Sequence, residues 1–216
     1  MKTKKVLKII GIAVIIALVL LIIHTIRNYI IIKNLQDKIA EYSNNQNHHI
    51  RIVSTQNDGT ILNTDYYKKD NKKVAFIERE KNGEIIKISM YDNGDTHHTY
   101  TDAEDKKIVS LNSGFIEVQI YNVAETTSFG QTIYSSIFAS IKKVKENGKE
   151  YYQLRHTASP YAMSFENDTI LVDKETGLMY KNINDISTVV REYEFNNVDE
   201  SIFIEPDITE YTIQEN

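Results

Sequence analysis

The chain has 216 residues, 41% of them hydrophobic, and its few glycines (8) and prolines (2) argue against a long disordered or low-complexity protein. Cysteine is absent, which excludes disulfides, thiolate metal ligands, a lipid-modified cysteine and a cysteine nucleophile. All 30 acidic residues follow Lys33, where only 19 basic residues lie, and this negative charge disfavours binding to nucleic acid.

An N-terminal apolar stretch is the strongest signal in the chain. Residues 9–26 are apolar apart from His24 and Thr25, and a helix of that length spans about 27 Å, close to the hydrocarbon thickness of a bilayer. Four lysines in residues 1–8 indicate that the N-terminus stays in the cytoplasm. A cleaved signal peptide is the alternative, but bulky residues rather than a small-x-small pair follow the stretch. We therefore predict a cytoplasmic tail (1–8) and an uncleaved transmembrane helix (9–26) in contact with the lipid bilayer.

The helix is expected to continue past the membrane. No glycine or proline occurs between Ile12 and Asp58. Ile32, Leu35, Ile39 and Tyr42 follow one another at helical spacing and form a single apolar stripe. This pattern predicts a membrane-proximal amphipathic helix over residues 27–44, packed on an extracellular domain formed by residues 45–216.

Beyond residue 50 the apolar pattern changes to the period of a β-strand. Residues 84–91 (EIIKISMY) and 115–121 (FIEVQIY) alternate between two faces. Turn signals separate such runs, and Asn-Gly favours a tight hairpin because both residues accept a positive φ. These signals predict a meander of antiparallel strands with one buried face; they lie at Asn57-Asp58-Gly59, Asn82-Gly83, Asn93-Gly94 and Asn147-Gly148.

Two further parts complete the predicted fold. Residues 127–144 carry apolar side chains three to four apart, which predicts a second helix that covers the inner face of the sheet. Residues 169–183 predict a hairpin that turns at residues 174–177, and residues 188–198 predict a long strand. A short piece follows and ends at Pro206, because proline cannot donate to a strand ladder. The fold class is α+β, with one N-terminal transmembrane helix and an antiparallel sheet packed on one or two helices.

The C-terminal part contains three short motifs. They are a D-x-x-T-G-L turn, a Y-x-F strand and an F-x-x-P-D ending, formed here by Asp173, Thr176, Gly177, Leu178, Tyr193, Phe195, Phe203, Pro206 and Asp207. With these motifs the chain resembles the lipoprotein-carrier (LolA-like) superfamily. The resemblance implies a strongly curved antiparallel sheet that wraps around helices and takes an apolar ligand, such as an acyl chain or a lipoprotein, on its concave side.

Residues that could carry chemistry are few. The pairs His48-His49 and His97-His98 could hold a metal only if one histidine of each met across strands beside Asp92 or Asp95, because neighbours on a strand face opposite ways. The sequences at residues 92–95 (DNGD) and 173–177 (DKETG) lack the oxygen ligands of a calcium loop and are typical of turns. No nucleophile elbow, phosphate-binding loop or zinc-protease motif occurs. We therefore predict no catalytic, cofactor-binding or metal residues, no cofactor and no enzyme activity.

These patterns support a membrane-anchored extracytoplasmic binding module, whose partner by resemblance is an apolar ligand. The 14 tyrosines, including Tyr66-Tyr67 and Tyr151-Tyr152, suit half-buried strand positions and equally suit a groove for a lipid tail or peptide. The alternative is an envelope protein–protein interaction domain without a small ligand, and an enzyme ranks third.

Overall fold

The computed structural model describes residues 2–104, 106–118, 120, 129–156 and 168–214. The chain forms two compact units. The first consists of Met1–Ile39 and Asn122–Leu178, and the second of Ala40–Tyr121 and Met179–Asn216. A single helix, α1 (Lys2–Ser43), begins in the first unit and ends in the second, so the unbroken helix predicted through residue 44 is confirmed to within one residue.

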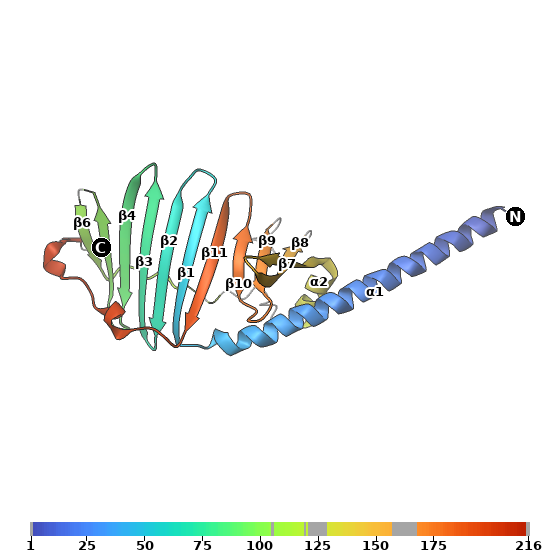
Figure 1. Ribbon diagram of the computed structural model, residues 1–216, viewed down its shortest axis with the longest axis horizontal. Coiled ribbons are helices and arrows are strands. Elements are labelled where there is room, and N and C mark those ends of the chain that lie inside the picture. The colour runs from blue at the N-terminus through green and yellow to red at the C-terminus, as the bar shows by residue number, and fades with distance from the viewer. Residues whose placement is uncertain (1, 105, 119, 121–128, 157–167, 215–216) are drawn as a thin grey trace. The chain divides into compact units, whose positions relative to one another are not determined.

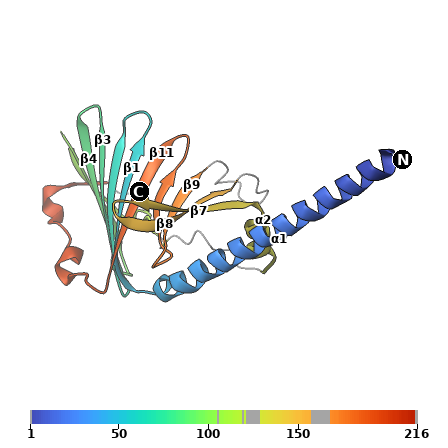
Figure 2. The same ribbon diagram turned by 45° about the vertical axis from the view of Figure 1, so that its right-hand side comes forward.

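The first unit joins most of α1 to a short helix and three strands. These are α2 (Phe129–Phe138), β7 (Ala139–Glu146), β8 (Lys149–His156) and β9 (Thr169–Asp173). The strands pair antiparallel in the order β7-β8-β9. Figures 1 and 2 both place α2 beside the middle of α1.

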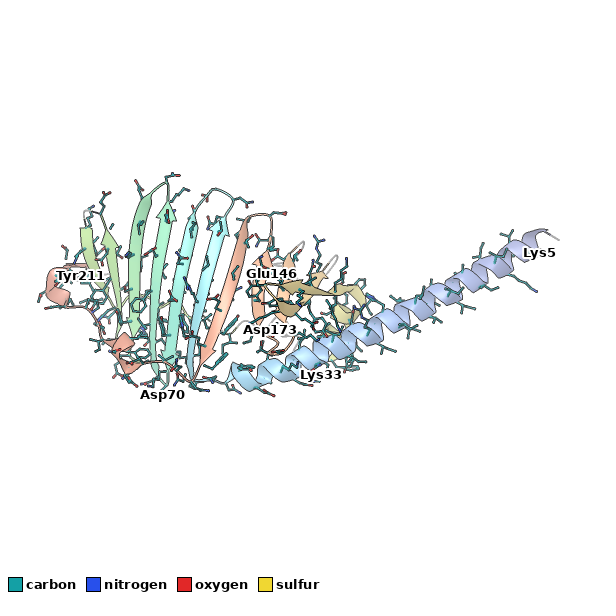
Figure 3. The ribbon with its side chains drawn as sticks, viewed as in Figure 1. Lys5, Lys33, Asp70, Glu146, Asp173 and Tyr211 are labelled. Carbon is teal, nitrogen blue, oxygen red and sulfur yellow. The ribbon has the colours of Figure 1, made fainter. Side chains whose placement is uncertain are left out.

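The stripe predicted on the membrane-proximal part of α1 is confirmed. Ile32, Leu35 and Ile39 are each less than 5% exposed. By contrast, the large apolar residues from Val6 to Ile26 are 47–67% exposed. Figure 3 shows side chains projecting from α1 between Lys33 and Lys5. By length and composition this part of α1 could cross a membrane, although a signal sequence at the N-terminus has the same properties.

The helix predicted over residues 127–144 is wrong in its second half. α2 ends at Phe138, and residues 139–146 form strand β7; residues 127–128 lie outside the described residues. The change of structure is explained by strand pairing. β7 carries Ile141 and Val144, whose branched side chains favour a strand, and the segment pairs along its whole length with β8. Tertiary pairing therefore overrides a helical spacing that has only modest helix propensity.

The second unit contains nine strands among its described residues. Their order is β12-β6-β5-β4-β3-β2-β1-β11-β10. Figure 1 shows this order from β6 to β10. All neighbours pair antiparallel except β12 and β6, which are parallel. The strands are β1 (Asn47–Gln56), β2 (Ile61–Lys69), β3 (Lys72–Lys81), β4 (Glu84–Asp92), β5 (His97–Ala103), β6 (Lys106–Leu111), β10 (Met179–Ile183), β11 (Ser187–Phe195) and β12 (Thr212–Gln214). Two short 3₁₀ helices, η1 (Glu200–Phe203) and η2 (Ile208–Glu210), separate β11 from β12.

The predicted turns are confirmed, and one predicted strand is wrong. Asn82-Gly83 and Asn147-Gly148 both have positive φ at their two residues, as a tight hairpin turn requires. Residues 115–118 and 120 form no strand, although the alternation of their side chains predicts one. Phe115, Val118 and Ile120 are partly buried by packing on a sheet rather than by pairing within one. The α+β class is confirmed, while the curvature of the sheet around helices stays a prediction.

Candidate functional site

The strands of the second unit bury a different apolar cluster on each face. On one face, which we call the Tyr66 face, the cluster comprises Ile50, Tyr66, Ala75 and Met90. On the opposite face, the Tyr67 face, it comprises Val74, Tyr91, Tyr100 and Val109, with Tyr67 packed against them. Tyr66 and Tyr67 thus point to opposite faces of β2, as expected for neighbours on a strand. Both are packing residues of a sheet.

The Tyr66 face is covered by the chain itself. Residues 113–118 and 120, which we call the covering segment, lie across it without regular secondary structure. Phe115, Val118 and Ile120 pack on the apolar cluster, and the Phe115 ring centroid is 6.2 Å from that of Tyr66. Ile116 points away and is 52% exposed. The Tyr66 face is therefore partly filled by this chain's own side chains.

Polar contacts hold the covering segment at two places. Glu117 Oε1 lies 3.4 Å from Lys73 Nζ on β3, and the same ammonium lies 3.4 Å from Oδ2 of the buried Asp92. The Ser113 and Thr99 hydroxyls form a hydrogen bond of 2.5 Å. Ser113 Oγ also donates to the Ser110 carbonyl oxygen of β6 at 3.5 Å, so the start of the covering segment is held to the sheet.

Two of the buried polar atoms that have no hydrogen-bond partner among the described residues lie close together on the Tyr66 face. They are the Tyr66 hydroxyl and Nε2 of His48, whose rings lie 5.9 Å apart. Burial raises the pKa of Tyr66 and lowers the pKa of His48, so both side chains are neutral at pH 7. His48 Nδ1 lies 2.8 Å from the carbonyl oxygen of Asn45, and in the neutral ring it donates to that oxygen, leaving Nε2 an acceptor. The Tyr66 face thus buries one neutral donor and one neutral acceptor within its apolar packing.

The histidine pairs do not come together. His49 stacks on Tyr67 and bonds Asp65 through Nε2 at 2.8 Å, whereas His48 lies on the opposite face. His98 Nδ1 lies 2.6 Å from Glu205, and His97 lies 3.5 Å from Asp92. Within the described part of the chain, no group of three or more His, Asp or Glu side chains could hold a metal ion.

The acidic turns have structural roles. Asp92 accepts a hydrogen bond from the Gly94 backbone at 2.8 Å, and Asn93 accepts from Asp95 and Thr96. In the first unit, Asp173 accepts from the backbone N–H groups of Glu175 and Thr176. These carboxylates are used within their own turns, as Asp and Asn commonly are.

Glu205 is a residue whose role sequence reasoning missed. Its carboxylate lies 2.6 Å from His98 and accepts from the Tyr100 hydroxyl at 2.8 Å on the Tyr67 face. Phe203 packs on the same face, and Asp207 caps η2 through the Thr209 backbone. The F-x-x-P-D ending therefore clamps the C-terminal segment onto the sheet. The contacts of Glu205 join residues more than one hundred positions apart, so no local sequence pattern could have predicted them.

The turn of the D-x-x-T-G-L motif lies against α1 within the first unit. Gly177 has a φ of +77°, and a Cβ added to it would lie 2.8 Å from the Leu35 carbonyl oxygen. Lys38 Nζ donates to the Lys174 carbonyl at 2.6 Å. Figure 3 marks Asp173 at the start of this turn. The motif thus fits a hairpin closely onto a helix, which is a structural and not a chemical task.

Comparisons with known proteins add little to these observations. No family model matches the sequence, and no curated protein matches it. Solved structures of 22 chains match this one, and the two named here resemble it weakly. MucB in complex with MucA(peri) is 12% identical over 81% of this chain, with a TM-score of 0.36, and this chain spans 59% of its length. The LolA superfamily protein NE2245 from Nitrosomonas europaea is 10% identical over 80% of this chain and 97% of its own, with a TM-score of 0.26. At such scores, function has to be argued from this chain's own residues.

Proposed function

We propose that this protein is a membrane-anchored module, held outside the cytoplasm, whose Tyr66 face binds an apolar ligand such as an acyl chain. The observation that supports the proposal is an apolar surface that continues across four strands. Its cover among the described residues is a segment without regular structure. Binding requires no chemistry beyond burial of apolar surface, which is favourable by about 25 cal/mol per Å².

The exposed part of α1 supports the membrane anchor. Leu18 and Ile22 are 54% and 56% exposed, and charged side chains are absent from residues 9–26. A continuous apolar surface of this length is stable in contact with lipid and unstable in water. The basic residues before it favour a cytoplasmic N-terminus and a C-terminal body on the far side of the membrane.

A row of isoleucines supports the apolar ligand. Ile52, Ile77 and Ile88 lie on the Tyr66 face of β1, β3 and β4 at matched strand positions, and each is only half-buried. The neutral polar atoms of His48 and Tyr66 lie on the same face. An acyl chain with a neutral polar end suits an apolar row with a few polar groups beside it.

A second candidate is a protein-interaction domain without a small ligand. It is favoured by the covering segment, because Phe115 already fills part of the face that a ligand would need. In this case the partner is another protein of the cell envelope.

Photo-crosslinking separates the two candidates. The full chain, in membranes that contain a photoreactive fatty acid, is expected to crosslink on β1, β3 or β4 as well as on α1. Ile88→Lys places a charge on the Tyr66 face and is expected to abolish the crosslink to the strands. Ile85→Lys, on the opposite face of the same strand, is the matched control and is expected to retain it. Crosslinks confined to α1 in the wild-type chain would refute the apolar ligand and leave the protein-interaction candidate.

The absence of cysteine makes topology directly testable. Single cysteines at Ile186 and Ile204, both more than 70% exposed, are expected to react with an impermeant maleimide on intact cells. A cysteine at Lys5 is expected to react only after lysis. The opposite pattern would refute the proposed orientation.

A further inference from the structure

We infer that α2 is a second membrane contact, which lies in the headgroup layer of the bilayer beside the span of α1. The inference rests on the proposed membrane anchor and adds a surface to it. All residues concerned belong to the first unit.

The composition of α2 is unusual for a helix at a water-exposed surface. Its ten residues, FGQTIYSSIF, include no charged side chain. Yet Phe129 is 71% exposed and Phe138 is 40% exposed, one at each end of the helix. A helix that faces water normally carries charged residues on its outer side. Exposed phenylalanines are typical of helices that lie in a membrane interface, where the aromatic rings face the acyl boundary.

α2 is fixed to α1 at the end of the apolar stretch. Asn28 is fully buried, and its Nδ2 donates to the carbonyl oxygens of Ser136 at 3.0 Å and Ala139 at 2.7 Å. Arg27 donates to the Ile141 carbonyl at 3.2 Å. The ring centroids of Tyr29 and Phe129 lie 6.4 Å apart in an edge-to-face arrangement. These contacts set the height of α2 along α1.

That height corresponds to the headgroup layer. Tyr29 lies three residues beyond Ile26, which is about 4.5 Å along a helix axis. The headgroup layer on each side of a bilayer is about 5–7 Å thick, so Tyr29 and its neighbour Phe129 fall within it. Ile30, 61% exposed, continues the apolar surface of α1 to this level.

Positive charge lies beside this surface. Arg27 on α1 and Lys142 and Lys143 at the start of β7 are exposed, and β7 follows α2 directly. Lipid phosphates attract such side chains. The bilayer therefore matches the surface both in its apolar part and in its charge.

Fluorescence quenching tests the inference on the full chain, which contains no tryptophan. Three single-tryptophan variants, Phe129→Trp, Leu18→Trp and Glu175→Trp, are placed in phosphatidylcholine–phosphatidylglycerol vesicles with a nitroxide near the headgroup or near the end of the acyl chain. Glu175 is a control within the same unit, because its turn contacts α1 near Ile39, about 20 Å along the helix from Ile26.

Phe129→Trp is expected to lose most fluorescence with the shallow nitroxide and Leu18→Trp with the deep one, while Glu175→Trp is quenched by neither. Phe138→Trp repeats the measurement at the other end of α2, in case the first substitution disturbs the contact with Tyr29. If Leu18→Trp is quenched and neither α2 reporter is, the inference is overturned while the anchor stands. If Leu18→Trp is not quenched either, the anchor itself is refuted.

Discussion

Replacing Gly177 with alanine is expected to destabilise the first unit more than any other glycine-to-alanine change at a turn described above. A Cβ at this position would lie 2.8 Å from the Leu35 carbonyl oxygen, a backbone atom of α1 that cannot turn aside. The left-handed backbone costs about 1–2 kcal/mol with an L side chain. Forcing the hairpin away from the helix adds about 1–3 kcal/mol, as overpacking does in cores. We expect a total loss of about 3 kcal/mol.

Gly148→Ala is the matched control. Gly148 has a similar φ of +83°, but a Cβ added there meets nothing within 4 Å. Gly148→Ala should therefore lose only the stability that a left-handed backbone costs with an L side chain, about 1–2 kcal/mol. Thermal unfolding of the full chain in detergent measures the loss of stability in each variant. Hydrogen exchange of the β8 and β9 amides measures the effect on the first unit separately. Equal losses in the two variants would show that the turn does not lie closely against α1.

Three other changes test different parts of the structure. Asn28→Ala removes the donor of hydrogen bonds to the Ser136 and Ala139 carbonyl oxygens. At about 1–3 kcal/mol for each bond, we expect the free energy of unfolding to fall by about 3 kcal/mol, with Asn44→Ala as the exposed control. Phe115→Ala should lower the free energy of unfolding by about 2 kcal/mol, roughly half the value for a fully buried phenylalanine. Ile116→Ala, at the outward-facing neighbour, should lower it by less than about 0.5 kcal/mol. Similar losses in the two variants would contradict the packing of the covering segment. Burial lowers the pKa of His48, so the unfolded chain binds a proton at this side chain more readily than the folded chain does. The free energy of unfolding is therefore unaffected by His48 above its ordinary pKa of about 6.5 and falls as the pH drops below that value. His48→Gln should flatten this dependence between about pH 7 and pH 5, and an unchanged slope would assign it to other groups.

Local patterns predicted most of the strands because local chemistry decides them. Asn-Gly pairs can take two successive positive φ values, and alternation fixes which residues of β4 face the cluster, so these elements follow from a few neighbouring residues. The stripe of Leu35 and Ile39 is equally local, and the structure buries it as expected.

The predictions that were wrong depend on distant parts of the chain. Residues 115–118 alternate like a strand, but β3, β4 and β5 already pair with one another, so Phe115 and Val118 pack on the face of the sheet instead. Residues 139–144 have helical spacing, but β8 offers a strand ladder that a helix could not use. The contact of His98 with Glu205 crosses more than one hundred residues, and the unpartnered buried atoms of His48 and Tyr66 are properties of three-dimensional packing.

The pairing of β1 has a consequence for how the chain is made. β1 lies between β2, which follows it at once, and β11, which is synthesised near the end. Until the ribosome has passed residue 195, one edge of β1 presents unpaired N–H and C=O groups to the surroundings, a template for pairing with other chains. A protein truncated before β11 would therefore keep an unpaired edge on β1. We expect such a product to aggregate or to be degraded rather than to retain partial function.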